Sequence, residues 1–365
     1  MGFQISDLSI GSHPSSFLSF LRVKPLKILI AVDAWFPYMS GVIRTFSSTI
    51  EQLRRRGDQV KIIYPTLFPT IPCPTYPDLR VAIWVKRKLG KMIDAFDPDA
   101  IHIATEGTVG AATRRYCLKR GIPFTTSFTT KLPEYIQARL FLPPSIAYAW
   151  LRRFHAPASC CMVSTDSVER ELHSRGFDNL VRWSRGVDTN LFYPRGKNFL
   201  TDPRPIWMHV GRVAVEKNIG AFLDLDLPGT KYVVGCGPQL KAFKRKYPDV
   251  RFVGEHRGEE LARYYSAADA TVMPSLTETF GLVILESLAC GVPVAAYPVT
   301  GPKDVIGNAA VGALDEDLGQ AARKALEISP QACSQFARKF SWANSTQQFR
   351  ENLHPFKPIP IRRAA

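Results

Sequence analysis

Long apolar segments are absent from this sequence of 365 residues. No run reaches about 18 apolar residues, the length that predicts a membrane-spanning helix. The first 25 residues also lack the signs of a signal peptide, since the apolar stretch at 17–21 is short, no basic segment precedes it and no small-residue cleavage site follows. We therefore expect a cytoplasmic protein that does not span a membrane.

Cysteines are few and scattered. The seven cysteines are odd in number and show no C-x-x-C spacing, which argues against a disulfide framework and a zinc module. We expect reduced and mostly buried thiols. The pairs Asp97/Asp99 and Asp224/Asp226 have D-x-D spacing, but both lie in stretches typical of turns, so we expect no metal site.

Acidic residues are in short supply relative to basic ones. The chain has 32 Asp and Glu against 47 Lys and Arg, a net charge of +15. Residues 1–200 alone carry 27 basic and 15 acidic side chains, a net charge of +12. A one-sided basic excess predicts an anionic partner such as nucleic acid, an acidic membrane surface or a phosphorylated substrate. The alternative is a basic surface that serves solubility alone.

What is present is a regular alternation of short apolar runs and amphipathic segments. Strands are expected near 27–33, 58–64, 100–104, 123–128 and 161–165, with helices between them and an irregular Pro-rich stretch at 65–77. After a polar segment at 194–205 the pattern restarts, with five further strands. Strands that alternate with helices predict parallel sheets covered on both faces.

The chain therefore reads as α/β, with two doubly wound, Rossmann-like domains that face a cleft. We expect an N-terminal extension at 1–26, a first domain at 27–195, a second domain at 203–345 and a C-terminal tail at 346–365 that packs back on the first domain. Ligands of such folds bind at the carboxyl ends of the strands.

Two glutamates lie at either end of an apolar helical run in the stretch 275–291. These are Glu278 and Glu286, and a carboxylate in such a run is costly to bury unless it has a partner. The backbone N–H groups of Phe280, Gly281 and Leu282 would form the helix N-terminus, which suits an anion or sugar hydroxyls. The alternative is a helix-cap acid and a solvated glutamate.

A pair of cations follows the first strand of the second half. Arg212 comes directly after Gly211, and Lys217 stands near the start of the next helix. Two cations beside a helix N-terminus at a strand end would bind a diphosphate.

These segments together resemble the donor half of family 4 retaining glycosyltransferases of GT-B architecture. The stretch ETFGLVILE matches the E-x7-E motif of that family, and GRVAVEKN matches its diphosphate-binding segment. The first half resembles the same family in AVDAWFPYMSGVIRT, IHIATEG and FTTSFTTKLPEY. The resemblance covers about 27 to 350 and is nearest to GDP-mannose-dependent mannosyltransferases and bacterial glycolipid synthases.

The resemblance implies roles for individual residues. Glu278 and the amides of 280–282 would contact the donor sugar, and Glu286 would hold the ribose hydroxyls. Gly41 would lie near the diphosphate. The branch usually has a histidine that touches the sugar where this chain has Thr129, followed by Lys131. We therefore expect a glucose or glucuronate donor in preference to mannose.

The resemblance also implies transfer with retention, no cofactor, and a UDP- or GDP-linked donor. A basic first half without a spanning helix favours a lipid acceptor such as diacylglycerol at the cytoplasmic face of the membrane. The predicted headgroup contacts are Lys86, Arg87, Lys88 and Lys91, and the helical stretch 143–155 is a second candidate. The alternatives are a solvated charged helix face for the first stretch and ordinary packing at the end of the first domain for the second.

Other readings remain open. One is a mannosyltransferase that uses GDP-mannose and acts on a phosphatidylinositol-type or soluble sugar acceptor. Another is a non-transferase nucleotide-binding protein, which is disfavoured because no G-x-G-x-x-G follows the first strand. Nucleic acid is not expected as a partner, because no recognition motif accompanies the charge.

Overall fold

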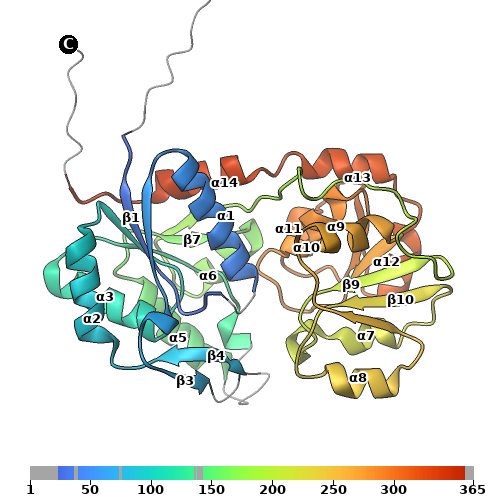
Figure 1. The fold of residues 1–365 in the computed structure, drawn as a ribbon, viewed down its shortest axis with the longest axis horizontal. Coiled ribbons are helices and arrows are strands. Elements are labelled where there is room, and N and C mark those ends of the chain that lie inside the picture. Colours follow the sequence, from blue (N-terminus) through green and yellow to red (C-terminus); the bar gives the residue numbers. More distant parts are fainter. Residues whose placement is uncertain (1–23, 37–39, 74–75, 135–136, 138–142, 358–365) are drawn as a thin grey trace, which may run out of the picture.

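The computed structural model describes residues 24–36, 40–73, 76–134, 137 and 143–357. The predicted extension 1–26 therefore lies almost entirely outside the described residues, as does the end of the predicted tail. Two lobes lie side by side, each built around a six-stranded sheet (Figure 1). The expectation of two doubly wound α/β domains is confirmed.

The first lobe has a parallel sheet whose strand order is β2-β1-β5-β6-β7-β8. Its strands are β1 (Lys27–Ala31), β2 (Gln59–Ile63), β5 (Ala100–Ile103), β6 (Thr125–Ser127), β7 (Cys161–Val163) and β8 (Leu180–Arg182). Its helices are α1 (Gly41–Arg55), α2 (Val85–Phe96), α3 (Thr108–Arg120), α5 (Pro144–His155) and α6 (Asp166–Ser174).

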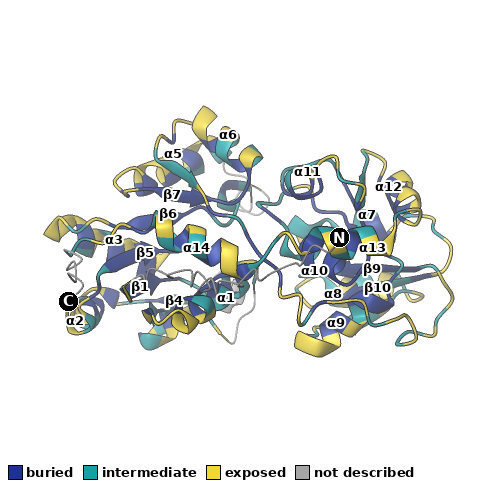
Figure 2. Ribbon diagram, turned by 90° about the horizontal axis from the view of Figure 1, so that it is seen from above, coloured by how far each residue is buried: buried dark blue, intermediate teal, exposed yellow. Residues whose placement is uncertain are grey.

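Alternate residues of β1 show why the strand is apolar throughout. Ile28 and Ile30 belong to the core layer that contains α1, whereas Leu29 and Ala31 belong to the layer that contains α2 and α3. Successive side chains of a strand point to opposite faces, so helices on both faces require apolar residues at every position. The same burial is visible at the centre of both lobes (Figure 2).

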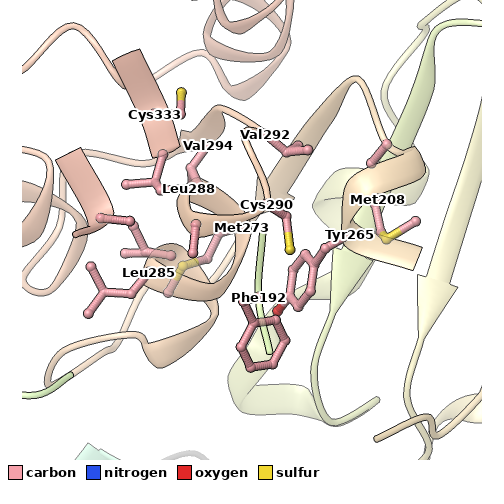
Figure 3. Packing of buried hydrophobic residues seen from close by; sticks show 14 of the residues in the cluster. Phe192, Met208, Tyr265, Met273, Leu285, Leu288, Cys290, Val292, Val294 and Cys333 are labelled. Atoms are coloured by element: carbon pink, nitrogen blue, oxygen red, sulfur yellow. The ribbon is translucent and has the colours of Figure 1, made fainter. Parts of the chain in front are cut away.

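The second lobe repeats this architecture with strand order β11-β10-β9-β12-β13-β14. Its strands are β9 (Ile206–Val210), β10 (Thr230–Val234), β11 (Arg251–Gly254), β12 (Ala270–Met273), β13 (Val294–Ala296) and β14 (Gly312–Leu314). Its helices are η2 (Val215–Lys217), α7 (Ile219–Leu223), α8 (Leu240–Lys246), α9 (Gly258–Ala267), α10 (Leu282–Ala289), α11 (Pro302–Val305), α12 (Leu318–Ala325) and α13 (Pro330–Ala337). Figure 3 shows the core under α9 and α10, where Tyr265 lies beside Phe192 and Cys290.

Strand order determines where each lobe can hold a ligand. In the second sheet β9 lies between β10 and β12, so the connections after β9 and β12 leave on opposite sides of the sheet. Crevices of this kind, at the carboxyl ends of the strands, are the usual ligand sites of doubly wound folds. The corresponding point of the first sheet lies between β1 and β5.

The last helix, α14 (Trp342–Asn352), leaves the second lobe and packs on the first, next to α1 (Figure 1). Its Phe349 is fully buried there against Phe46 and Trp183. The predicted boundary between residues 345 and 346 falls within this helix. The return of the chain therefore begins a few residues earlier than that boundary.

One element differs from the sequence expectation. The stretch predicted to be irregular contains an antiparallel hairpin of β3 (Thr70–Cys73) and β4 (Tyr76–Ala82). The expectation of irregular structure here was wrong, because prolines are compatible with a strand that pairs on one edge only. The hairpin forms a separate two-stranded sheet beside the first lobe.

Candidate active site

The connection after β12 places both motif glutamates where the second sheet reverses its winding. β12 ends at Met273, and α10 starts after Gly281, which has a left-handed backbone with φ of 87°. A side chain would be strained at this angle, so glycine permits the abrupt start of the helix. The Phe280 side chain is buried in the core, which anchors the connection just before the helix.

Glu278 forms an ion pair with Lys217, the last residue of η2, at 2.5 Å between Oε1 and Nζ. The two side chains are 10% and 23% exposed, so the pair is largely withdrawn from water. The neighbouring Asn218 donates its side-chain amide to the carbonyl of Pro274 at 3.1 Å. The connections after β9 and β12 are thus joined, and Arg212 lies at the start of the first of them.

Backbone packing holds the segment around Arg212 in place. A Cβ atom on Gly235 would lie 1.8 Å from the carbonyl oxygen of Gly211, and one on Gly237 would lie 2.4 Å from that of Val213. Only glycine fits at such distances from a backbone. Gly235 and Gly237 therefore support the segment that carries the predicted diphosphate cations.

Glu286 is buried within α10, with 4% of its surface exposed. One carboxylate oxygen pairs with Arg44 of α1, and the other accepts a hydrogen bond from the Tyr265 hydroxyl at 3.1 Å. Burial raises the pKa of Tyr265 well above its usual value, with the adjacent carboxylate as a further cause, so the phenol remains a donor. The alternative reading of Glu286 as a solvated position is wrong.

The first lobe meets the same connection from the opposite side. The carbonyl of Thr279 accepts hydrogen bonds from Ser164 at 2.8 Å and Thr165 at 3.4 Å. Its hydroxyl donates to the carbonyl of Thr129 at 3.0 Å. Gly41 begins α1 and faces Leu282, since a Cβ added to it would lie 4.0 Å from Cδ1 of that leucine. The predicted donor-site residues of both halves therefore lie on the two sides of one interface.

Lys131 lies near Thr129 in sequence but has a partner within the first lobe. Its ammonium group pairs with Glu171 of α6 at 2.8 Å, and the Lys131 side chain is 11% exposed. Glu171 also accepts a hydrogen bond from Tyr148. The positive charge expected to act beside Thr129 is thus balanced by a carboxylate of its own lobe.

Two histidines near strand ends are core residues. His102 has hydrogen-bonding contacts with Thr125 at 2.9 Å and Ser127 at 3.2 Å, and burial lowers its pKa to about 3. His209 contacts the carbonyl of Val272 at 3.1 Å, and burial lowers its pKa to about 4. Both rings are therefore neutral at neutral pH.

The four cations predicted to meet lipid headgroups lie elsewhere. Figures 1 and 2 show α2 at the outer end of the first lobe, far from α10. All four side chains are exposed, and Trp84 just before the helix is 82% exposed. In the described part of the chain no helix is long and apolar enough to cross a bilayer. The four exposed cations of α2 are Lys86, Arg87, Lys88 and Lys91.

Three residues at this interface have no signal in the sequence, namely Arg44, Tyr265 and Thr279. Arg44 lies within an ordinary amphipathic helix pattern, and Tyr265 reads as a core aromatic. Their partners are 242 and 21 residues away in the sequence, so no local spacing indicates either contact.

Comparisons with known proteins agree with this geometry. A family model described as Glycosyltransferase Family 4 matches residues 39–191, and one described as Glycosyl transferases group 1 matches residues 204–329. The chain is 27% identical to a GDP-mannose-dependent alpha-mannosyltransferase of Mycobacterium tuberculosis, over 77% of this chain and 81% of the relative. It is 27% identical to sulfoquinovosyl transferase SQD2 of Arabidopsis thaliana, over 91% of this chain and 74% of the relative.

A third relative is the alpha-monoglucosyldiacylglycerol synthase of Streptococcus pneumoniae, 25% identical over 91% of this chain and 85% of the relative. Among solved structures, sucrose-phosphate synthase of Thermosynechococcus elongatus superposes with a TM-score of 0.71 at 20% identity, covering 89% of this chain and 97% of that one. Anabaena HepE, in complex with UDP and glucose, superposes with a TM-score of 0.68 at 15% identity, covering 89% of this chain and 98% of that one.

The two facing Rossmann-like lobes and these matches define a glycosyltransferase of GT-B architecture. Within that class the chain is similar to the family 4 glycosyltransferases, whose family model matches residues 39–191.

Proposed function

We propose that this enzyme is a retaining glycosyltransferase that moves a hexosyl or hexuronosyl group from a UDP- or GDP-linked donor to a membrane lipid such as diacylglycerol. The observation that carries the donor half is the joined pair of connections after β9 and β12. They bring Lys217, Glu278 and the start of α10 together at the point where ligands of this fold bind. HepE, a structural neighbour, was solved with UDP and glucose.

The proposed reaction requires stabilisation of the negative charge on the leaving diphosphate. The bond between the anomeric carbon and the diphosphate oxygen breaks, and the acceptor hydroxyl oxygen bonds to the same face of the sugar. The acceptor proton passes to the leaving diphosphate, which needs no protein nucleophile, metal or cofactor in this proposal. Arg212, Lys217 and the N-terminus of α10 would stabilise the charge that grows on the leaving group.

Acceptors for hydroxyl groups complete the donor site. Glu278, held by Lys217, would accept from the sugar, with the backbone of Phe280, Gly281 and Leu282 beside it. Glu286 would accept from the ribose. Gly211, Gly41 and the backbone near Thr129 would line the same space from either side.

The lipid acceptor is supported by the surface of α2. Four exposed cations stand beside an 82% exposed tryptophan, a combination suited to the interface of an acidic membrane. Two of the relatives are named as a sulfoquinovosyl transferase and a glucosyldiacylglycerol synthase. The enzyme would then be a peripheral protein on the cytoplasmic face.

The alternative is mannosyl transfer from GDP-mannose to a phosphatidylinositol-type or soluble acceptor. It is favoured by the mannosyltransferase relatives and by the pairing of Lys131 with Glu171, which removes a reason to expect an acidic donor sugar. Thr129 in place of the branch's histidine favours the first proposal.

A product search by mass distinguishes these proposals. The purified protein is incubated with acidic vesicles that contain diacylglycerol, together with one donor at a time. The three donors are UDP-glucose, UDP-glucuronate and GDP-mannose. A glycosylated diacylglycerol from a UDP-linked donor supports the proposal. A product from GDP-mannose alone overturns the donor preference. Release of nucleotide without any lipid product contradicts the lipid acceptor.

A further inference from the structure

Arg44 crosses from the first lobe to the second. It lies near the start of α1 and forms an ion pair with Glu286 of α10. The Arg44 side chain is 30% exposed and the glutamate side chain 5%, so the pair lies at the edge of the second-lobe core. The carboxylate raises the pKa of the arginine above its usual value. The arginine therefore stays charged beside the glutamate.

The two oxygens of Glu286 are held by different lobes. Tyr265 belongs to α9 and is fully buried in the second-lobe core, where Figure 3 shows it packed against Phe192. Its hydroxyl holds one oxygen, and Arg44 holds the other. A charge-assisted hydrogen bond orients a carboxylate more strongly than a neutral one does. The orientation of Glu286 therefore depends on a residue of the opposite lobe.

We propose that Arg44 is a positioning residue of the donor site, which keeps the Glu286 side chain aimed at the paired ribose hydroxyls of the nucleotide. This inference rests on the proposed function. A carboxylate offers about four acceptor positions, of which Arg44 and Tyr265 occupy two. Two remain, which matches the two hydroxyl donors of a ribose.

The arrangement links ribose recognition to the approach of the two lobes. Without Arg44, the buried Glu286 side chain would keep only the hydrogen bond from the Tyr265 hydroxyl. One of its two oxygens would then no longer be held, so the carboxylate could turn away from the ribose. The enzyme would then lose its preference for a nucleotide with ribose over one whose sugar lacks these hydroxyls.

The test compares UDP and GDP with their 2′,3′-dideoxy forms, by calorimetric binding to the full chain. The wild-type protein should bind the ribose form of at least one nucleotide about tenfold or more tightly, the effect of one hydrogen bond to a charged group. Arg44→Met should reduce this preference to about twofold or less, and Arg44→Lys should restore part of it. Glu286→Gln should lose the preference to a similar degree.

A matched control is Arg55→Met, because Arg55 is an exposed arginine on the same helix that pairs with Glu51. It should keep the wild-type preference. Thermal unfolding of each variant checks that the chain remains folded, and Arg44→Lys serves as the test variant if Arg44→Met does not fold. In that case, a preference equal to that of the wild type overturns the inference.

The remaining outcomes separate the two proposals. If Glu286→Gln loses the ribose preference while Arg44→Met keeps it, the inference is wrong and the proposed function stands. Tighter ribose binding by Arg44→Met also overturns it, because Arg44 would then compete with the ribose. A wild-type protein that binds neither nucleotide overturns the proposed donor site and the inference with it.

Discussion

Glu278 and Glu286 both lie on the connection after β12, but the cations that pair with them come from different lobes. Lys217 reaches Glu278 from the second lobe itself, whereas Arg44 reaches Glu286 from the first. Removing one member of a buried pair leaves an uncompensated charge. Each glutamate is therefore held in place by a named cation, and its remaining acceptor positions can take hydrogen bonds from hydroxyl groups.

The cations after β9 give a prediction at this scale. Arg212→Ala and Lys217→Ala should each lower turnover by two or more orders of magnitude, since a preorganised contact with the leaving group contributes about 3–4 kcal/mol. Steady-state rates with the donor found by the product search provide the measurement. Lys246→Ala, on the exposed face of α8, should have a near-normal rate. A near-normal rate for either of the first two variants would contradict their assignment.

Among the elements, α10 has a short apolar run and an abrupt start. It extends over Leu282–Ala289, and most of its residues are buried under α9 and α13. The helix is therefore fixed by packing and not by its own length, since short helices are marginal in isolation. Its N-terminus stays at the strand ends because the rest of the helix cannot move out of the core.

α2 is the element that should decide membrane binding. Reversing the charges of Lys86, Arg87, Lys88 and Lys91 to glutamate should abolish flotation with acidic vesicles, because each cation near an acidic surface contributes on the order of 1 kcal/mol.

The matched control for α2 is the second exposed basic helix, α8, in which four cations can be reversed in the same way. Its surface lacks an exposed tryptophan beside the charges, so vesicle binding should persist. If both helices matter equally, net charge and not the surface of α2 is responsible. The control positions are Lys241, Lys244, Arg245 and Lys246.

At the scale of the whole molecule, the chain crosses between the lobes twice. It enters the second lobe after β8 and returns in α14, which completes the core of the first lobe. The lobes also meet through Arg44–Glu286, through the contacts of Thr279, and through the backbone N–H of Ser167, which donates to Asp304 at 2.9 Å. These are polar contacts, so the interface can be rearranged without exposing a large apolar core.

The return of α14 gives a prediction about stability. Phe349→Ala should lower the free energy of unfolding by about 3–5 kcal/mol, the usual cost of removing a buried phenylalanine. Hydrogen exchange read by mass spectrometry should show faster exchange in β1 and α1, with β9 and β10 little changed. Leu326→Ala, at a position that is 40% exposed, is the control. Faster exchange confined to the second lobe would contradict the role of α14.

The sequence by itself determined the two parallel sheets and the class of enzyme, a glycosyltransferase. Apolar strands such as 27–31 and 206–210 indicate burial on both faces, and the pattern restarts once. It also marked Glu278 and Glu286 on the connection after β12 and Lys217 on the connection after β9, because each motif lies within one connection. The hairpin at 70–82 was missed, since prolines obscured its strand pattern.

Only the tertiary structure decided how these residues are partnered. Arg44 and Glu286 are 242 residues apart in the sequence, and Thr279 and Thr129 are 150 residues apart. Lys131 forms an ion pair with Glu171 of its own lobe. Local periodicity records which face of an element is buried. It does not record which lobe packs against that face, so contacts across the interface follow from the packing of the whole chain.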